Sequence, residues 1–229
     1  MSVLDDIASL LLPRHCPVCR RRLEHAERSL CSVCASAMPR LQLGRLDDNV
    51  MLRRLWARLP LEHAFALLAY RHHSPFHELL VRIKYEGDTS LAVRLGRWTG
   101  EEAMSAGMGG HADALVPVPL ARGRMRKRGY NQARLLADGM ASAMCVPVVE
   151  MLVRKGRGES QTRLSAMQRG SNAAGVYHAR VPQVWRGGRI VLVDHVMTTG
   201  ATLAQCAEAI LRDDPTARVS LLTLAFAGE

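Results

Sequence analysis

The residues with the clearest chemical potential lie between a strand pattern and a helix pattern near the C-terminus. The stretch RIVLVDHVMTTGATL, residues 189–203, runs from an apolar strand into an Asp-His pair and then into a loop of small and hydroxyl-bearing residues. Small residues let a phosphate approach the backbone, and the first amides of the next helix point at such a ligand. The hydroxyls of Thr198, Thr199 and Thr202 add donors. We interpret the loop as a phosphate site; the alternative is an ordinary N-capped turn.

A second stretch with chemical potential follows another strand pattern, in LVPVPLARGRMRKRGYNQARLLA, residues 115–137. Ligands of parallel α/β sheets bind at the carboxyl ends of the strands, so we expect these residues at the same mouth as the threonine loop. A polyanion such as pyrophosphate or a nucleic-acid backbone would complement the charge, although a solvated charge run is the usual alternative. Five of the seven residues in the run are basic: Arg122, Arg124, Arg126, Lys127 and Arg128.

Four of the six cysteines form two CxxC pairs near the N-terminus. The pairs are CPVC and CSVC, eleven residues apart, with the candidate ligands Cys16, Cys19, Cys31 and Cys34. Each pair forms a tight knuckle that places two sulfurs on one metal, and two such pairs are typical of a structural Zn²⁺ site. The alternatives are disulfides or free core thiols. Cys145 and Cys206 stand singly in helix patterns, and we expect both to be buried.

Composition narrows the class of protein. The 229 residues are 48% apolar, which is ample for a packed core, and their formal net charge of +10 favours an anionic partner. No apolar run approaches the roughly 18 residues that a membrane span needs. The start carries Asp5 and Asp6 and its apolar run ends at Pro13, so it predicts an amphipathic helix over residues 4–11, not a signal peptide. We expect a cytoplasmic protein.

Strand and helix patterns alternate from about residue 63 to the C-terminus. This alternation predicts an α/β domain with a mostly parallel sheet and helices on both faces. We expect three parts: a helix and zinc-binding module over residues 1–38, a basic connector over 39–62 and the α/β domain over 63–229. The expected strands are 63–70, 112–120, 146–154, 190–194 and 217–227, and the expected helices are 74–88, 91–106, 131–145 and 201–213.

Taken in order, these motifs resemble those of the ComF family, the ComFC- or GntX-like proteins. An apolar strand, an aspartate and TTGATL are similar to the phosphoribosyl-pyrophosphate motif of type I phosphoribosyltransferases. The other matching blocks are the CxxC pairs, VPVPL followed by RxxxRGYNQAxLLA, and LxRxxxxxxQTxLSxxxRxxN at residues 152–172. The resemblance runs from about residue 14 to the C-terminus, and the ordered combination is far more specific than any one block.

The resemblance implies a phosphoribosyltransferase-like domain with an amino-terminal zinc module, in a protein that handles imported single-stranded DNA during natural transformation. Implied partners are phosphoribosyl pyrophosphate with Mg²⁺, single-stranded DNA, and a competence helicase or another DNA-processing protein. The 5-phosphate would be held by Thr198, Thr199, Gly200, Ala201 and Thr202. The pyrophosphate would be approached by Val118, Pro119, Leu120 and Arg128. Residues 157–169 resemble a mobile cover over the site.

The chain departs from the family pattern at His195. Family members usually have two adjacent acids where this chain has Asp194 and His195, the candidate catalytic residues. Those acids face the ribose and the positive charge that develops on the sugar as pyrophosphate leaves. Neutral imidazole accepts a hydroxyl hydrogen bond but supplies no negative charge, so the change threatens catalysis more than binding. The alternative is that His195 points into the sheet edge and Asp194 alone suffices.

Three functions fit these motifs. The first is a phosphoribosyl-pyrophosphate-binding protein of natural competence. The second is an active phosphoribosyltransferase with an unknown acceptor, and the third is a DNA- or protein-binding scaffold with a vestigial pocket. No motif identifies a pocket that recognises a base.

Overall fold

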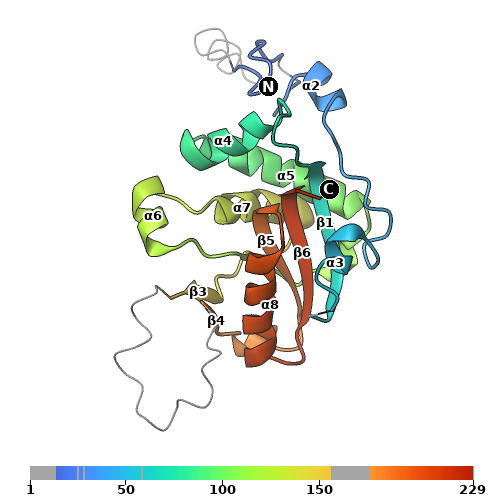
Figure 1. The fold of residues 1–229 in the computed structure, drawn as a ribbon, viewed down its shortest axis with the longest axis vertical. Helices are drawn as coiled ribbons and strands as arrows, with labels where there is room; N and C mark the ends of the chain where they lie inside the picture. The colour runs from blue at the N-terminus through green and yellow to red at the C-terminus, as the bar shows by residue number, and fades with distance from the viewer. Residues whose placement is uncertain (1–13, 25, 28, 58, 156–175, 229) are drawn as a thin grey trace.

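The computed structural model describes residues 14–24, 26–27, 29–57, 59–155 and 176–228. The helix expected over residues 4–11 and the cover expected over 157–169 lie outside this part of the chain. The centre of the molecule is a four-stranded sheet flanked by helices, with the cysteine module above α4 in Figure 1. The expected α/β architecture and cysteine module are therefore confirmed.

The central sheet is parallel throughout, in the order β1-β6-β5-β2. Its strands are β1 (Leu61–Ala69), β2 (Ala114–Pro117), β5 (Arg189–Met197) and β6 (Arg218–Phe226). β5 and β6 lie at the centre, and their apolar runs are continuous because both faces of the sheet are covered. The register places Pro117 beside Val193, so β2 and β5 end at the same edge of the sheet.

The helices connect the strands and cover both faces. They are α2 (Ser32–Ser36), α3 (Val50–Arg53), α4 (His77–Tyr85), α5 (Thr89–Ser105), α6 (Arg122–Arg128), α7 (Gln132–Met144) and α8 (Ala201–Asp213). Two short 3₁₀ turns cover Met108–His111 and Gln183–Trp185. A separate antiparallel pair is formed by β3 (Leu152–Arg154) and β4 (Tyr177–Ala179).

The side chains on the two faces of the sheet pack into two separate apolar cores. On one face, Val191 and Val193 of β5 pack with α5, α7 and the apolar side chains of the cysteine module. On the other face, Ile190 and Leu192 pack with α3, α8 and β4. Figure 1 shows α8 and α7 on opposite sides of the sheet. This two-sided burial accounts for the uninterrupted apolar character of the central strands.

Helices α5 and α7 approach each other unusually closely. A Cβ on Gly96 of α5 would lie 2.2 Å from the carbonyl oxygen of Leu136, and a Cβ on Gly139 of α7 would lie 2.1 Å from that of Val93. These distances are too short for any side chain. The two glycines therefore permit a backbone-to-backbone contact between the helices.

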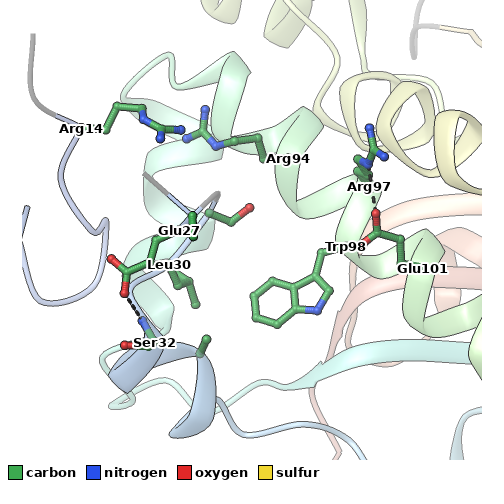
Figure 2. A pocket seen from close by; sticks show the side chains of 11 residues that line it. Arg14, Glu27, Leu30, Ser32, Arg94, Arg97, Trp98 and Glu101 are labelled. Atoms are coloured by element: carbon green, nitrogen blue, oxygen red, sulfur yellow. Dashed lines mark hydrogen bonds and ion pairs between the residues drawn. The ribbon is translucent and has the colours of Figure 1, made fainter. Parts of the chain in front are cut away.

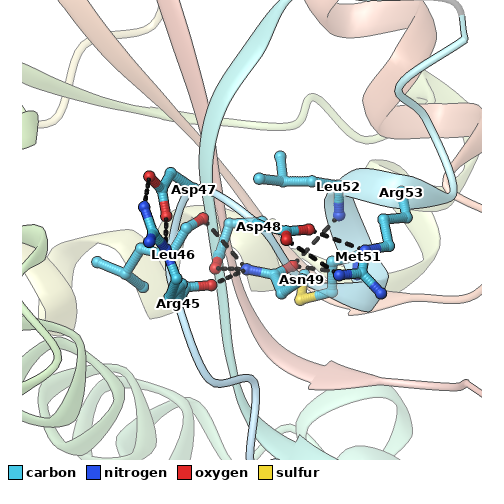
Figure 3. Close-up of polar contacts among 9 residues, drawn as sticks. Arg45, Leu46, Asp47, Asp48, Asn49, Met51, Leu52 and Arg53 are labelled. Atoms are coloured by element: carbon cyan, nitrogen blue, oxygen red, sulfur yellow. Dashed lines mark hydrogen bonds and ion pairs between the residues drawn. The ribbon is translucent and has the colours of Figure 1, made fainter.

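The segment expected to be a basic connector is tied to the sheet through Asn49. The buried side-chain amide of Asn49 donates to the carbonyl of Ala64 in β1 at 3.0 Å, and also to the carbonyls of Arg45 and Leu46 (Figure 3). Its side-chain oxygen caps α3 by accepting from the Met51 amide at 3.1 Å. α3 is thereby held against β1, and Met51 is fully buried. The division of the chain into three parts stays a prediction.

The basic run is itself a helix, α6, for which no secondary structure was predicted. Two local features differ from the expectations. Of the strand expected over 146–154, residues 152–154 form β3, which pairs with β4 outside the central sheet, while Val148 makes an isolated parallel bridge to Leu115 of β2. Cys206 is buried as expected, but Cys145 is exposed because it ends α7 in the left-handed conformation, with φ of 56°.

Candidate functional site

The four cysteines of the CxxC pairs converge on one point. Their sulfur atoms all lie within 4.8 Å of one another, and the Sγ atoms of Cys19 and Cys31 are 3.6 Å apart. Zinc–sulfur bonds of about 2.3 Å in a tetrahedron place the sulfurs about 3.8 Å apart, so the cluster fits one such ion. All four are free cysteines, and no disulfide joins any two of them.

Backbone amides point at these sulfurs. The amide of Cys34 donates to Sγ of Cys31 at 3.4 Å. Burial alone would raise the pKa of the Cys16 thiol, but amides that include those of Cys19 and Cys31 lower it to about 7. Amides directed at a sulfur stabilise the thiolate, which is the form that binds metal. The four residues can hold a metal ion such as zinc.

The threonine loop joins β5 to α8 at the carboxyl edge of the sheet. Gly200 is the N-cap of α8 and adopts the left-handed conformation with φ of 78°, so no side chain at the N-cap satisfies the first amides of the helix. The hydroxyl of Thr199 accepts from the Ala201 amide at 3.4 Å, a long contact. Thr198 and Thr202 are exposed, and the loop lines a cavity of about 40 Å³ that also includes Asp194. Backbone and hydroxyl donors therefore face a space that suits a phosphate.

Two residues of the connector, Arg54 and Leu55, contact this loop. Nη1 of Arg54 donates to the carbonyl oxygen of Thr198 at 2.6 Å and to that of Ala227 at 3.0 Å. The guanidinium also lies 4.9 Å from the centre of the Phe226 ring. Leu55 is buried, and its Cδ2 would lie 2.9 Å from a Cβ on Gly200. The loop is thus held between α8 and a segment 144 residues earlier in the chain.

Asp194 and His195 form a hydrogen-bonded pair at the end of β5. Oδ1 of Asp194 accepts from the backbone amide of His195 at 2.7 Å and lies 2.7 Å from its Nδ1. An ionised carboxylate only accepts, so Nδ1 of His195 carries the proton in this contact. Asp194 is 8% exposed. The imidazole therefore does not point away from the acid. One carboxylate oxygen is occupied by the chain itself.

The turn expected to approach pyrophosphate lies beside this pair. The amide of Val118 donates to the carbonyl of Val193 at 2.9 Å, which places the turn next to the residue before Asp194. Asn131 then holds the turn, because its side-chain amide donates to the Val118 carbonyl at 3.0 Å while its oxygen caps α7. Pro119 and Leu120 are half-buried at the strand end. The sheet thus brings the two predicted anion-binding stretches together.

A basic hollow opens between α4 and α6. It has a volume of about 550 Å³ and is lined by Lys84, Tyr85, Glu86, Gly87, Arg124, Lys127, Arg128 and Tyr130. The guanidinium of Arg128 lies 5.5 Å from the centre of the Tyr85 ring, and the hydroxyl of Tyr130 donates to the Ile83 carbonyl at 2.7 Å. Three of the five predicted basic residues line this space. Arg122 and Arg126 are exposed on α6 and are not among its lining residues.

Lys84 connects the basic hollow to Asp194. Burial lowers the pKa of Lys84, the charges of Arg128 and Arg124 lower it further, and the carboxylate of Asp194 raises it. These interactions place an ammonium group within the electrostatic reach of both the acid and α6. Sequence reasoning missed Lys84 and Arg54. The isolated lysine near the end of a helix pattern and the arginine in a connector gave no signal, because both act through contacts distant in sequence.

Within the described part of the chain, no helix has the length and apolarity that crossing a bilayer requires.

Comparison with known proteins places these features in a family context. No protein-family model matches the chain. DNA utilization protein YhgH of Salmonella typhimurium is 29% identical over 216 residues, which cover 89% of this chain and 93% of that protein. Competence protein ComFC of Bacillus subtilis is 26% identical over 209 residues, covering 91% of this chain and 82% of that protein.

Two further matches are partial. Competence protein F of Haemophilus influenzae is 33% identical over 100 residues, or 43% of this chain and 44% of that protein. Among solved structures, the glutamine phosphoribosylpyrophosphate amidotransferase of B. subtilis with ADP and GMP is matched over 58% of this chain and 26% of that chain, at 22% identity and a TM-score of 0.40. The sequence matches along about nine-tenths of the chain are the informative ones: the chain is similar to the DNA utilization protein YhgH and to the competence protein ComFC.

Proposed function

We propose that this protein binds phosphoribosyl pyrophosphate with Mg²⁺ and acts in natural competence, in the handling of imported single-stranded DNA. The observation that carries the proposal is the shared cavity of the threonine loop and Asp194 at the carboxyl edge of the sheet. Thr198, Thr199, Gly200, Ala201 and Thr202 would hold the 5-phosphate. The names of the ComFC and YhgH relatives support the assignment to competence or DNA use.

The pyrophosphate has a matching basic environment. Val118, Pro119 and Leu120 would approach it, together with Arg128 and the newly found Lys84. A bound Mg²⁺ would neutralise part of the pyrophosphate charge, and the carboxylate of Asp194 directly follows Val193, which pairs with Pro117 at the start of this turn. This chain's own residues would thus bind both ends of the ligand.

The cysteine cluster would hold a structural Zn²⁺, for which four thiolates are the preferred ligands. Single-stranded DNA would contact α6, whose exposed residues Arg122, Arg124, Arg126 and Lys127 neutralise phosphates without reading sequence. A cytoplasmic location and a helicase partner stay predictions.

Thermal unfolding of the metal-loaded chain with increasing phosphoribosyl pyrophosphate and Mg²⁺ tests the proposal. A ligand at 100 times its Kd stabilises the folded state by about 2.7 kcal/mol, which raises the Tm of a chain this size by roughly 5–10 °C. Thr202→Val removes one hydroxyl at nearly constant shape and should weaken binding about fivefold, a loss of about 1 kcal/mol. Thr89→Val, at the exposed start of α5, is the matched control. Absence of any stabilisation at millimolar ligand contradicts the proposal.

Turnover is the second candidate, favoured by the buried acid beside the anion-binding turn. The His195 side chain and amide occupy one oxygen of Asp194, which favours binding over catalysis. Release of pyrophosphate should be measured with a panel of bases and amines for the wild type, Asp194→Ala and His195→Asp. Turnover lost in Asp194→Ala establishes an enzyme. Activity that appears only in His195→Asp establishes a binding protein with a lost acid.

A further inference from the structure

A second hollow lies between the cysteine module and α5, away from the threonine loop. Its volume is about 680 Å³, and its walls come from residues 14–35 on one side and from α5 on the other (Figure 2). Cavities of 300–1,000 Å³ accommodate small organic ligands. None of the residues of the threonine loop, the pyrophosphate turn or α6 lines it.

One stripe of α5 forms the floor of this hollow. Arg94, Arg97, Trp98 and Glu101 follow the spacing i, i+3, i+4 and i+7, which places them on one face of the helix. Leu91 and Leu95 of the same helix are fully buried in the core. The helix therefore anchors itself through its apolar residues and presents charge and one aromatic ring to the hollow.

Two guanidinium groups meet across the hollow. The side chains of Arg14 and Arg94 point toward one another in Figure 2. Burial lowers the pKa of Arg94, and the charges of Arg14 and Arg82 lower it further, while Asp88 raises it. Nη1 of Arg94 donates to the Ser90 hydroxyl at 3.0 Å, and its buried Nε has no hydrogen-bond partner among the described residues.

The acids of the hollow are engaged elsewhere. Oε1 of Glu101 accepts from Arg97 at 3.0 Å, and Oε1 of Glu27 accepts from Arg21 at 3.0 Å and from the Ser32 amide at 2.6 Å. The facing pair of Arg14 and Arg94 is therefore not neutralised by the carboxylates that line the hollow. An anion between two guanidiniums would supply that charge and a partner for Nε.

Trp98 adds a flat apolar surface beside the two cations. The indole projects into the hollow in Figure 2, and its orientation is set because Nε1 donates to Glu102 at 3.1 Å. A ring system stacks readily on such a surface. Leu30 and Ala35 line the space opposite the helix and add apolar surface to it. The hollow thus combines a place for an anion with a place for a planar ring.

We propose that this hollow binds a nucleoside monophosphate unit, with its phosphate between Arg14 and Arg94 and its base against Trp98. The unit is either a free nucleotide or one residue of single-stranded DNA, since both present the same phosphate and base. The site is separate from the threonine loop and does not depend on binding of phosphoribosyl pyrophosphate there.

Fluorescence of Trp98 gives a local readout. The chain has three tryptophans, so the variant Trp56→Phe/Trp185→Phe keeps Trp98 as the only one. Thymidine monophosphate should quench it saturably, while thymidine alone and inorganic phosphate alone should bind at least about tenfold more weakly, because each fills half of the site. Oligodeoxythymidylate forms the second arm. Quenching by the oligonucleotide alone assigns the site to single-stranded DNA, and equal affinity for the mononucleotide assigns it to a free nucleotide.

Charge variants locate the phosphate. Arg14→Gln and Arg94→Gln should each weaken the quenching ligand about tenfold, whereas Arg212→Gln, an exposed change on α8, should leave it unaltered. Arg94→Gln should keep the thermal shift with phosphoribosyl pyrophosphate, which shows that the variant folds and separates this site from the threonine loop. Three results overturn the proposal: no quenching of Trp98 by either probe, equal affinity in all three arginine variants, or quenching that appears only when residues 1–13 are removed.

Discussion

Gly200→Ala tests whether the connector holds the threonine loop. Gly200 has φ of 78°, and an added Cβ would lie 2.9 Å from Cδ2 of Leu55 and 2.9 Å from Cε of Met197. The left-handed conformation costs a residue with a Cβ about 1–2 kcal/mol. Both clashing atoms are ends of buried but flexible side chains, so the overpacking term is about 1 kcal/mol, the low end of its range.

The two terms add to about 2–3 kcal/mol of lost unfolding free energy. For a chain of this size the expected fall in Tm is roughly 4–12 °C. Gly123→Ala on α6 is the matched control, because its Cβ meets nothing within 4 Å and its φ is not positive. That control should leave Tm unchanged or raise it slightly, since alanine favours a helix.

A double-mutant cycle separates the two terms. In the Leu55→Ala background the contact with Leu55 is gone and only the one with Met197 remains. Gly200→Ala should therefore cost less than in the wild type, but still at least the conformational term of about 1–2 kcal/mol. Urea unfolding of the four proteins measures the difference. An equal cost of Gly200→Ala in both backgrounds, or no cost in either, refutes the inferred contact between the connector and the loop.

Three further predictions concern the same framework. Arg54→Gln removes donors to the Thr198 and Ala227 carbonyls and should cost about 1 kcal/mol in urea unfolding. Arg53→Gln loses only an exposed ion pair with Asp48 and should cost less, so an equal effect of the two changes would contradict the role of Arg54. Burial and the charge of His111 lower the pKa of His63 below its usual 6.5, so the unfolded state takes up a proton at a higher pH than the folded state does. The free energy of unfolding, measured with urea, should therefore be at its full value above pH 6.5 and decline below it. His63→Gln should make that decline shallower. Cys34→Ser, or a chelator, should lower Tm by several degrees and remove bound metal in elemental analysis, whereas Cys145→Ser, at an exposed thiol, should do neither.

Local patterns were enough to predict the elements that carry the two anion-binding stretches. The apolar run before Asp194 predicted β5, and the periodicity after the threonines predicted α8, because each signal lies within a short window of residues. Their meeting at one edge followed from the rule that parallel strands end together, and the Pro117–Val193 register bears it out.

The roles of Arg54 and Lys84 were not predicted, because both depend on contacts between segments that are distant in sequence. Arg54 supports the threonine loop only because Asn49 fixes α3 against β1, and no local pattern records that tether. Lys84 becomes relevant only when α4 and α6 pack near Asp194. The helix α6 over the basic run was not predicted, because seven residues with five like charges favour helix weakly in isolation.

The contact between Gly96 and Gly139 has a consequence for which residues the helix pair tolerates. At these two glycines α5 and α7 pack backbone against backbone, with no side chain between them. One of the helices carries Trp98 on the hollow beside the cysteine module, and the other has as its N-cap Asn131, which holds the turn at Val118. Even a methyl group at either glycine would force the two helices apart, and with them the hollow and the turn that they support.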